Sequence, residues 1–151
     1  MDKAVQFSLF LVNKPGVLAQ VTGQLAEAKV NLCAMTMVDS SEHGVLRLVA
    51  SDPGKARRTL QRLELPMSET DVLSVTMSNR PGAMADICGK LAAAHININY
   101  AYCTGGAAGG KATGIFKVAD LAKAIKVLAP ATDRRRDDKR TRRRPASRAR
   151  R

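Results

Sequence analysis

A glycine-rich run in the second half of the chain ends in a lysine. The run from Gly105 to Gly110, followed by Lys111, has the spacing of loops whose backbone amides and lysine bind the phosphates of a nucleotide. Ala112, however, stands where that loop needs a hydroxyl for its metal ion, and the next residues alternate like a strand, where a phosphate loop requires a helix. The sequence therefore favours a flexible connection between two strands, with a lid over a neighbouring pocket as an alternative role.

The other residue types that do chemistry are scattered. Cys33, Cys88 and Cys103 form an odd set without C-x-x-C spacing, and His43 and His95 stand at no metal-ligand spacing from each other or from a cysteine. The chain also lacks a recognisable pairing of nucleophile with base, or of two carboxylates. The sequence therefore predicts reduced thiols, no metal, no cofactor and a protein that is not an enzyme.

The chain repeats itself at an offset of 66 residues. Residues 13–32 align without gaps on residues 79–98, and nine of these 20 positions are identical. Each copy contains Asn-x-Pro-Gly, then a Gly and a Leu-Ala pair, then an Asn between two apolar residues. Self-similarity at a fixed offset indicates two units of the same fold.

Each copy predicts the same first elements. Alternating apolar residues predict a strand over residues 5–11 and again over 73–77. Pro15 and Pro81 then suit a first helical turn, and the apolar spacing that follows predicts a helix of about four turns.

Two hairpins and two short helices complete the pattern. The hairpins are predicted within residues 30–50 and 96–118, and Asp52 and Asp120 are expected to cap the short helices that follow. Residues 66–70 predict a strand that closes the first copy and runs directly into the second. The second copy has no such strand, because an arginine-rich run follows its last helix.

This order predicts an α+β fold, a ferredoxin-like βαββαβ unit repeated twice. We expect the antiparallel sheets to pack side by side with the helices on one face. The predicted organisation is a first repeat at 1–69, a second at 70–131 with its closing strand apparently missing, and a disordered tail at 132–151. Because an uncovered sheet edge promotes association, a homodimer is expected.

The repeated turn, helix and strand pattern resembles the ACT domain family over roughly residues 4–128. Small proteins with two such domains and no catalytic domain are amino-acid-binding modules. The resemblance implies a regulatory protein whose ligand lies at the interface between ACT repeats, held by an Asn of the turn and an Asn at the start of a neighbouring second strand. The matching positions are Asn13 and Asn79 in the turns, and Asn31 and Asn97 at the strands.

An amide side chain suits a zwitterion because it offers both a donor and an acceptor. The alternative role of each Asn is to cap a helix or satisfy a turn. Gly16 and Gly82 precede helix starts whose N–H groups attract a carboxylate, although a conformational role explains them equally well. Leu11 and Met77 stand where the family's serine binders carry a histidine, which favours a ligand with an apolar side chain, such as a branched-chain amino acid.

The basic residues are concentrated in the tail, which leaves a further function open. The chain carries +12, but residues 133–151 hold 11 of the 25 lysines and arginines and three of the 13 acidic residues, which leaves +4 for residues 1–132. The tail could bind nucleic acid through its charge.

A regulatory subunit that docks on a biosynthetic enzyme such as acetolactate synthase is the other alternative. No apolar run approaches the roughly 18 residues of a membrane span, so we expect a cytoplasmic protein that does not enter membranes.

Overall fold

The computed structural model describes residues 1–38 and 43–129 of the 151-residue chain. The predicted tail and the end of the second repeat lie outside the described residues. The described part contains six strands and four helices, in the order β1 (Asp2–Val12), α1 (Val17–Glu27), β2 (Leu32–Val38), β3 (His43–Ala50), α2 (Pro53–Gln61), β4 (Met67–Ser78), α3 (Ala83–Ala93), β5 (Ile98–Thr104), β6 (Lys111–Val118) and α4 (Leu121–Leu128). The predicted order of elements is confirmed.

The longer helices begin later than the prolines suggest. Gly16 and Gly82 are the N-cap residues of α1 and α3, so both prolines lie in the turn before the helix. Each helix has 11 residues, or about three turns at 3.6 residues per turn, rather than the four predicted. The short helices start as predicted, because the carboxylates of Asp52 and Asp120 each accept a hydrogen bond of 2.9 Å from a backbone N–H three residues on.

One antiparallel sheet joins the two repeats, with the strand order β2-β3-β1-β4-β6-β5. The two central strands are shared. The first part of β4, from Met67, pairs with β1 and closes the first repeat, as predicted for residues 66–70. The rest of β4 is the first strand of the second repeat and pairs with β6 from Leu73 to Ser78.

The start of β1 takes part of the closing position in the second repeat. Asp2, Lys3 and Ala4 pair with β4 on the side opposite β6. Over this short stretch, the first residues of the same chain therefore occupy the place of a closing strand in the second repeat. Each repeat is completed by a strand that belongs to the other.

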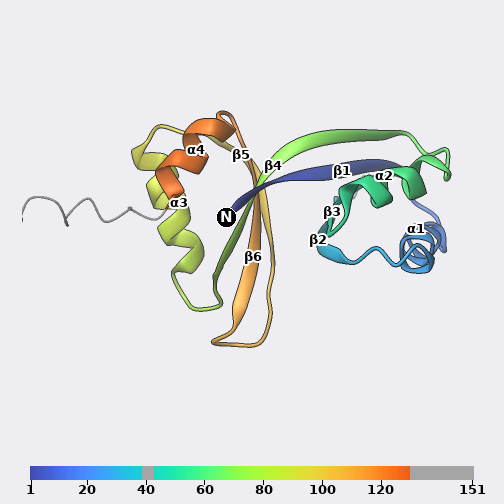
Figure 1. The fold of residues 1–151 in the computed structure, drawn as a ribbon, viewed down its shortest axis with the longest axis horizontal. Helices are drawn as coiled ribbons and strands as arrows, with labels where there is room; N and C mark the ends of the chain where they lie inside the picture. The colour runs from blue at the N-terminus through green and yellow to red at the C-terminus, as the bar shows by residue number, and fades with distance from the viewer. Residues whose placement is uncertain (39–42, 130–151) are drawn as a thin grey trace, which may run out of the picture.

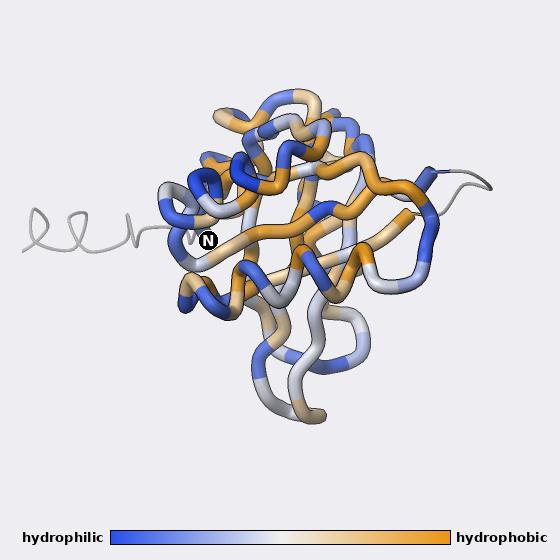
Figure 2. The backbone as a smooth tube through the Cα atoms, turned by 90° about the vertical axis from the view of Figure 1, so that its right-hand side faces the viewer, coloured by the Kyte–Doolittle hydropathy of each residue, from blue (hydrophilic) through white to orange (hydrophobic). Residues whose placement is uncertain are grey.

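The sheet is curled, and the helices lie outside it. Figure 1 shows α1 and α2 on one side, α3 and α4 on the other, and the long strands β1 and β4 running between the two groups. Hydrophobic stretches follow the central strands, whereas hydrophilic residues gather at turns and on helices (Figure 2). All four helices cover the same face of the sheet, because the odd-numbered residues of β1 and β4 face helices in both repeats.

Three apolar clusters hold this arrangement together. Two of them are the repeat cores, centred on Phe7 in the first and Phe116 in the second, both fully buried between sheet and helices. The third joins the repeats across the helix-free face and contains Ala34, Val49 and Ile115. Burial of the third cluster stabilises the two repeats as one unit.

A β-bulge in the second strand of each repeat changes the face of the sheet on which the following side chains lie. The ladder shifts register between Leu32 and Ala34 in β2 and between Ile98 and Tyr100 in β5, at equivalent places in the two repeats. Simple alternation places Ile98 and Tyr100 on one face, and this is wrong. Ile98 packs in the second repeat core, whereas Tyr102, two residues after Tyr100, belongs to the cluster between the repeats.

Candidate ligand-binding site

A strand, a tight turn and a helix start form the framework of the candidate site in each repeat. Gly16 and Gly82 have φ values of 91° and 86°, in the left-handed region that favours glycine. A Cβ atom at Gly16 would meet nothing within 4 Å. The conformational role of this glycine is thus evident from its backbone, whereas its role toward a ligand stays a prediction.

Asn79 fastens the glycine-rich connection between β5 and β6. Its side-chain amide donates hydrogen bonds to the carbonyl oxygens of Gly106 and Ala107, at 2.7 and 3.1 Å. Its backbone N–H donates to the carbonyl of Gly110 at 2.8 Å, and its own carbonyl accepts from Gly109. The loop therefore lies against the turn, and its next element is β6, as expected for a strand connection.

The predicted asparagines of one repeat lie at opposite ends of a helix. Asn13 precedes α1 and Asn31 follows it, and Asn79 and Asn97 bracket α3 in the same way. All but Asn79, which is half-buried, are exposed. An 11-residue helix is about 16 Å long, so a single amino acid could contact both types of asparagine only where two domains meet.

Leu11 and Met77 occupy equivalent positions but different surroundings. The Leu11 side chain is fully buried in the core of the first repeat. Met77 is half-buried and lines a cavity in the second repeat. Of the eight predicted ligand residues, the structure places Met77 in this cavity, together with Ser78 and Arg80 on either side of Asn79 and with Ala83 after Gly82. The ligand role of all eight stays a prediction.

The cavity has a volume of about 360 Å³ and lies between β4 and α3. Its apolar wall comes from Val75 and Met77 on the strand, from Ala83 and Ile87 on the helix, and from Leu128 at the end of α4. This volume lies within the range of small-molecule pockets, near its lower end.

Charged side chains surround the entrance. Arg80 and Asp86 form an ion pair of 2.6 Å, and Lys90 lies one helical turn beyond Asp86 on α3. Both members of the pair are more than half exposed. The entrance thus offers two cations and one carboxylate above an apolar wall, a combination that suits a small zwitterion with an apolar side chain.

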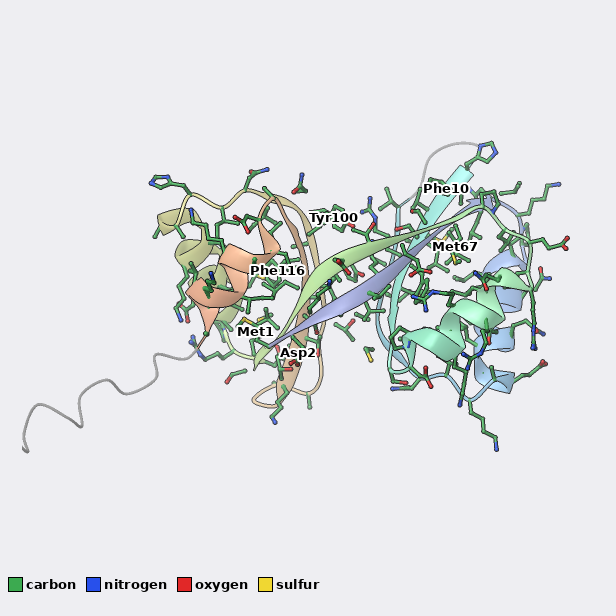
Figure 3. All side chains as sticks on the ribbon, turned by 45° about the horizontal axis from the view of Figure 1, so that its top comes forward. Met1, Asp2, Phe10, Met67, Tyr100 and Phe116 are labelled. Atoms are coloured by element: carbon green, nitrogen blue, oxygen red, sulfur yellow. The ribbon has the colours of Figure 1, made fainter. Side chains whose placement is uncertain are left out.

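A polar cluster on the helix-free face joins the repeats. Gln6, fully buried on β1, donates hydrogen bonds to the hydroxyls of Tyr100 at 2.8 Å and Ser8 at 3.1 Å, and its carbonyl oxygen accepts from Tyr102 at 3.0 Å. The guanidinium of Arg47 lies 4.0 Å from the centre of the Tyr100 ring. Figure 3 shows Tyr100 between the two halves of the molecule. On this face, the interface between the two repeats is therefore filled by the chain's own side chains.

Burial raises the pKa of the Tyr102 hydroxyl well above its usual range. The neighbouring Tyr100 adds to this increase in pKa, and the positive charge of Arg47 opposes it. The neutral hydroxyl is therefore strongly favoured, in keeping with its role as a donor to Gln6. The spacing of Tyr100 and Tyr102 in a strand predicts core or pocket wall, and Tyr102 packs in the cluster between the repeats. The hydrogen bonds of both tyrosines with Gln6 were not predicted.

Within residues 1–38 and 43–129, three or more His, Cys, Asp or Glu side chains never gather as a metal site requires. None of the helices in this part of the chain is long and apolar enough to cross a membrane.

Comparison with known proteins agrees with the fold. Residues 3–133 match the family described as the ACT domain pair. A crystal structure of a protein from Bacteroides thetaiotaomicron is 35% identical, covers 83% of this chain and 86% of its own, and superposes with a TM-score of 0.76. The ligand-free regulatory subunit of aspartate kinase from Thermus thermophilus shares the fold at 15% identity, with 85% and 91% of the two chains covered and a TM-score of 0.61. No curated protein matches the sequence at a significant level.

Fold and site together define a tandem α+β module in which two ferredoxin-like units share one sheet. The chain belongs to the ACT domain pair family.

Proposed function

We propose that this protein is a non-catalytic regulator of amino-acid metabolism that binds a free amino acid in the cytoplasm. The family supports a regulatory role, and the aspartate kinase regulatory subunit from Thermus thermophilus has the same fold. The cavity beside α3 supports a small ligand, because its apolar wall and charged entrance match the two parts of an amino acid.

The exchange of closing strands carries the regulatory part of the proposal. β4 closes the first repeat and begins the second, while the start of β1 completes the second. A ligand that tightens the packing around β4 therefore acts on both repeats at once. Such a ligand biases the whole molecule, which is the physical requirement for a signal between distant sites.

A thermal-shift screen tests the proposal. The purified full chain is heated in the presence of each of the twenty amino acids at millimolar concentration. We expect one chemical group of amino acids to raise the unfolding midpoint, since a ligand at a hundredfold excess over its Kd stabilises the folded state by about 2.7 kcal/mol. If no amino acid shifts the midpoint, the proposed ligand class is wrong.

A second surface favours association with another protein. Phe10, Val12 and Val38, on the helix-free face of the first repeat, are between 46% and 48% exposed; we call them the apolar patch. At the same places in the second repeat, the chain has the smaller and more polar residues Thr76, Ser78 and Thr104. An exposed apolar group confined to one of two equivalent surfaces is typical of an interface.

We propose that the apolar patch contacts a second copy of the chain or, alternatively, a partner enzyme. Light scattering after size exclusion distinguishes the two. A dimer that dissociates in Phe10→Ser, but not in the matched second-repeat variant Thr76→Ser, supports self-association. A wild-type monomer would leave the partner enzyme as the occupant.

A further inference from the structure

In the first repeat, the chain itself fills the space beside the first strand. Met67 is the ladder partner of Leu9, and the N–H of Phe10 donates to the carbonyl of Pro66 at 3.0 Å. Continuing this antiparallel register places Leu65 opposite Leu11. Leu65 packs against the core of the first repeat, so a leucine side chain occupies this place.

In the second repeat the matching place holds the cavity. Asp2 pairs with Ser74, and the same register brings Met1 opposite Val75, in the place that Met67 takes in the first repeat. Figure 3 shows Met1 and Met67 at opposite ends of the paired strands β1 and β4. Met1 lines the cavity, and on the β1 side of β4 none of the described residues lies opposite Met77, where the counterpart of Leu65 would stand.

Residues 130–151 lie outside the described residues, and they contain no Val, Leu, Ile, Met or Phe. From β3 and β6 onward, matching elements of the two repeats differ by 68 residues, since α2 follows Asp52 and α4 follows Asp120. At that offset, Leu63 and Leu65 correspond to Ala131 and Asp133. Within residues 1–38 and 43–129, the cavity therefore lies at the place that a leucine side chain takes in the first repeat.

Two β4 residues of the cavity lining direct their backbone N–H groups away from β6. The N–H of Asn79 points toward β6, where it donates to Gly110. Because successive N–H groups of a strand point to alternate sides, the N–H groups of Thr76 and Ser78 point away from β6. Both residues line the cavity. In the first repeat, the backbone N–H of Phe10, the counterpart of Thr76, donates to the carbonyl of Pro66.

We propose that this cavity binds a free aliphatic α-amino acid of leucine size, a specification that rests on the proposed function. Its side chain takes the place that Leu65 holds in the first repeat, against Met77 and Ile87. Its carboxylate accepts hydrogen bonds from the strand amides and faces Lys90, and its ammonium group faces Asp86. The ligand thus replaces a missing piece of the fold, which explains how a small molecule stabilises the second repeat.

Isothermal titration calorimetry on the full chain tests the site and the ligand class. Leucine is expected to bind. Valine and alanine should bind more weakly, by a factor of about four for each methylene that they lack relative to leucine. Lys90→Ala weakens leucine binding at least about tenfold, because a charged partner of the carboxylate is lost. Lys126→Ala, an equal change of charge on α4 away from the cavity, leaves the affinity unchanged.

Ala83→Phe provides an independent variant. Ala83 is 7% exposed and lines the cavity, so a phenyl ring fills the space. We expect leucine binding to disappear while the unfolding midpoint of the ligand-free protein rises. If Ala83→Phe fails to fold, the exposed Lys90→Ala variant still decides.

The outcomes separate the two proposals. Binding of an amino acid with equal affinity to wild type, Lys90→Ala and Ala83→Phe would overturn this site but leave the proposed function standing. Preference for an acidic or aromatic amino acid would overturn the ligand class. If no amino acid binds to the wild-type chain, both proposals fail.

Discussion

The side-chain amide of Gln6 on β1 donates a hydrogen bond of 2.8 Å to the hydroxyl of Tyr100 on β5. This bond links residues 94 positions apart and lies where the helix-free faces of the two repeats meet. Gln6 also accepts a hydrogen bond from Tyr102, so one buried side chain serves both tyrosines. The two repeats are thus joined by polar as well as apolar contacts.

Replacing Gln6 tests this connection. Gln6→Leu replaces the amide by an apolar side chain of similar size and leaves the hydroxyls of Tyr100 and Tyr102 without that partner. We expect the free energy of unfolding in urea to fall by about 1–3 kcal/mol. Gln20→Leu, on the exposed face of α1, is the control and should change it by less than about 0.5 kcal/mol. Equal effects of both substitutions would contradict a structural role for Gln6.

The raised pKa of Tyr102 predicts a loss of stability at alkaline pH. The unfolded tyrosine loses its proton near its ordinary pKa of about 10, whereas the folded one keeps it to higher pH. Above about pH 10 the folded state therefore holds more protons, and stability falls as pH rises. Below that pH the contribution is fully present. Urea titrations between about pH 8 and 11 should show a steeper fall for wild type than for Tyr102→Phe; parallel curves would contradict this assignment.

Two glycines of the second repeat should respond oppositely to alanine. Gly82 has a φ of 86°, so Gly82→Ala forces a left-handed backbone and costs about 1 kcal/mol of stability. Gly89 lies inside α3, and a Cβ there would meet nothing within 4 Å. Gly89→Ala should therefore stabilise the protein by up to about 1 kcal/mol. Thermal unfolding of the two variants measures the difference, and shifts of the same sign would refute the explanation.

The shared strands predict that neither repeat folds alone. A fragment of residues 1–66 lacks the β4 residues that pair with β1, and a fragment of residues 67–129 lacks the start of β1. We expect narrow amide dispersion in the ¹H–¹⁵N NMR spectrum of each fragment and wide dispersion for residues 1–129. A dispersed spectrum from either fragment alone would show that the exchange of strands is dispensable.

Local patterns in the sequence predicted much of the fold. The repeat, the order of elements, the caps at Asp52 and Asp120, and the strand that runs out of residues 66–70 all follow from spacing within short windows. The pairing of Asp2 with Ser74 could not be predicted in this way. It depends on how far two distant strands slide past each other, which alternation alone does not specify.

The candidate site was less accessible to sequence reasoning. Met77 was named because it stands where the family's serine binders carry a histidine, and it lines the cavity. Lys90 and Asp86 were missed because they are ordinary exposed helix residues in sequence, and they gain meaning only beside an unfilled space. That space becomes visible when the surroundings of Leu65 and of Met77 are compared in three dimensions.

An NMR titration of the ¹⁵N-labelled full chain with leucine tests the central claim most directly. The account predicts saturable shifts of the Thr76 and Ser78 amides and of the first turn of α3, with the equivalent amides of the first repeat, Phe10 and Val12, unaffected. Saturable shifts confined to other parts of the molecule would show that the binding site lies outside this cavity. A spectrum unchanged by leucine, and by every other amino acid at millimolar concentration, would contradict the claim that this ACT domain pair is an amino-acid-binding regulator.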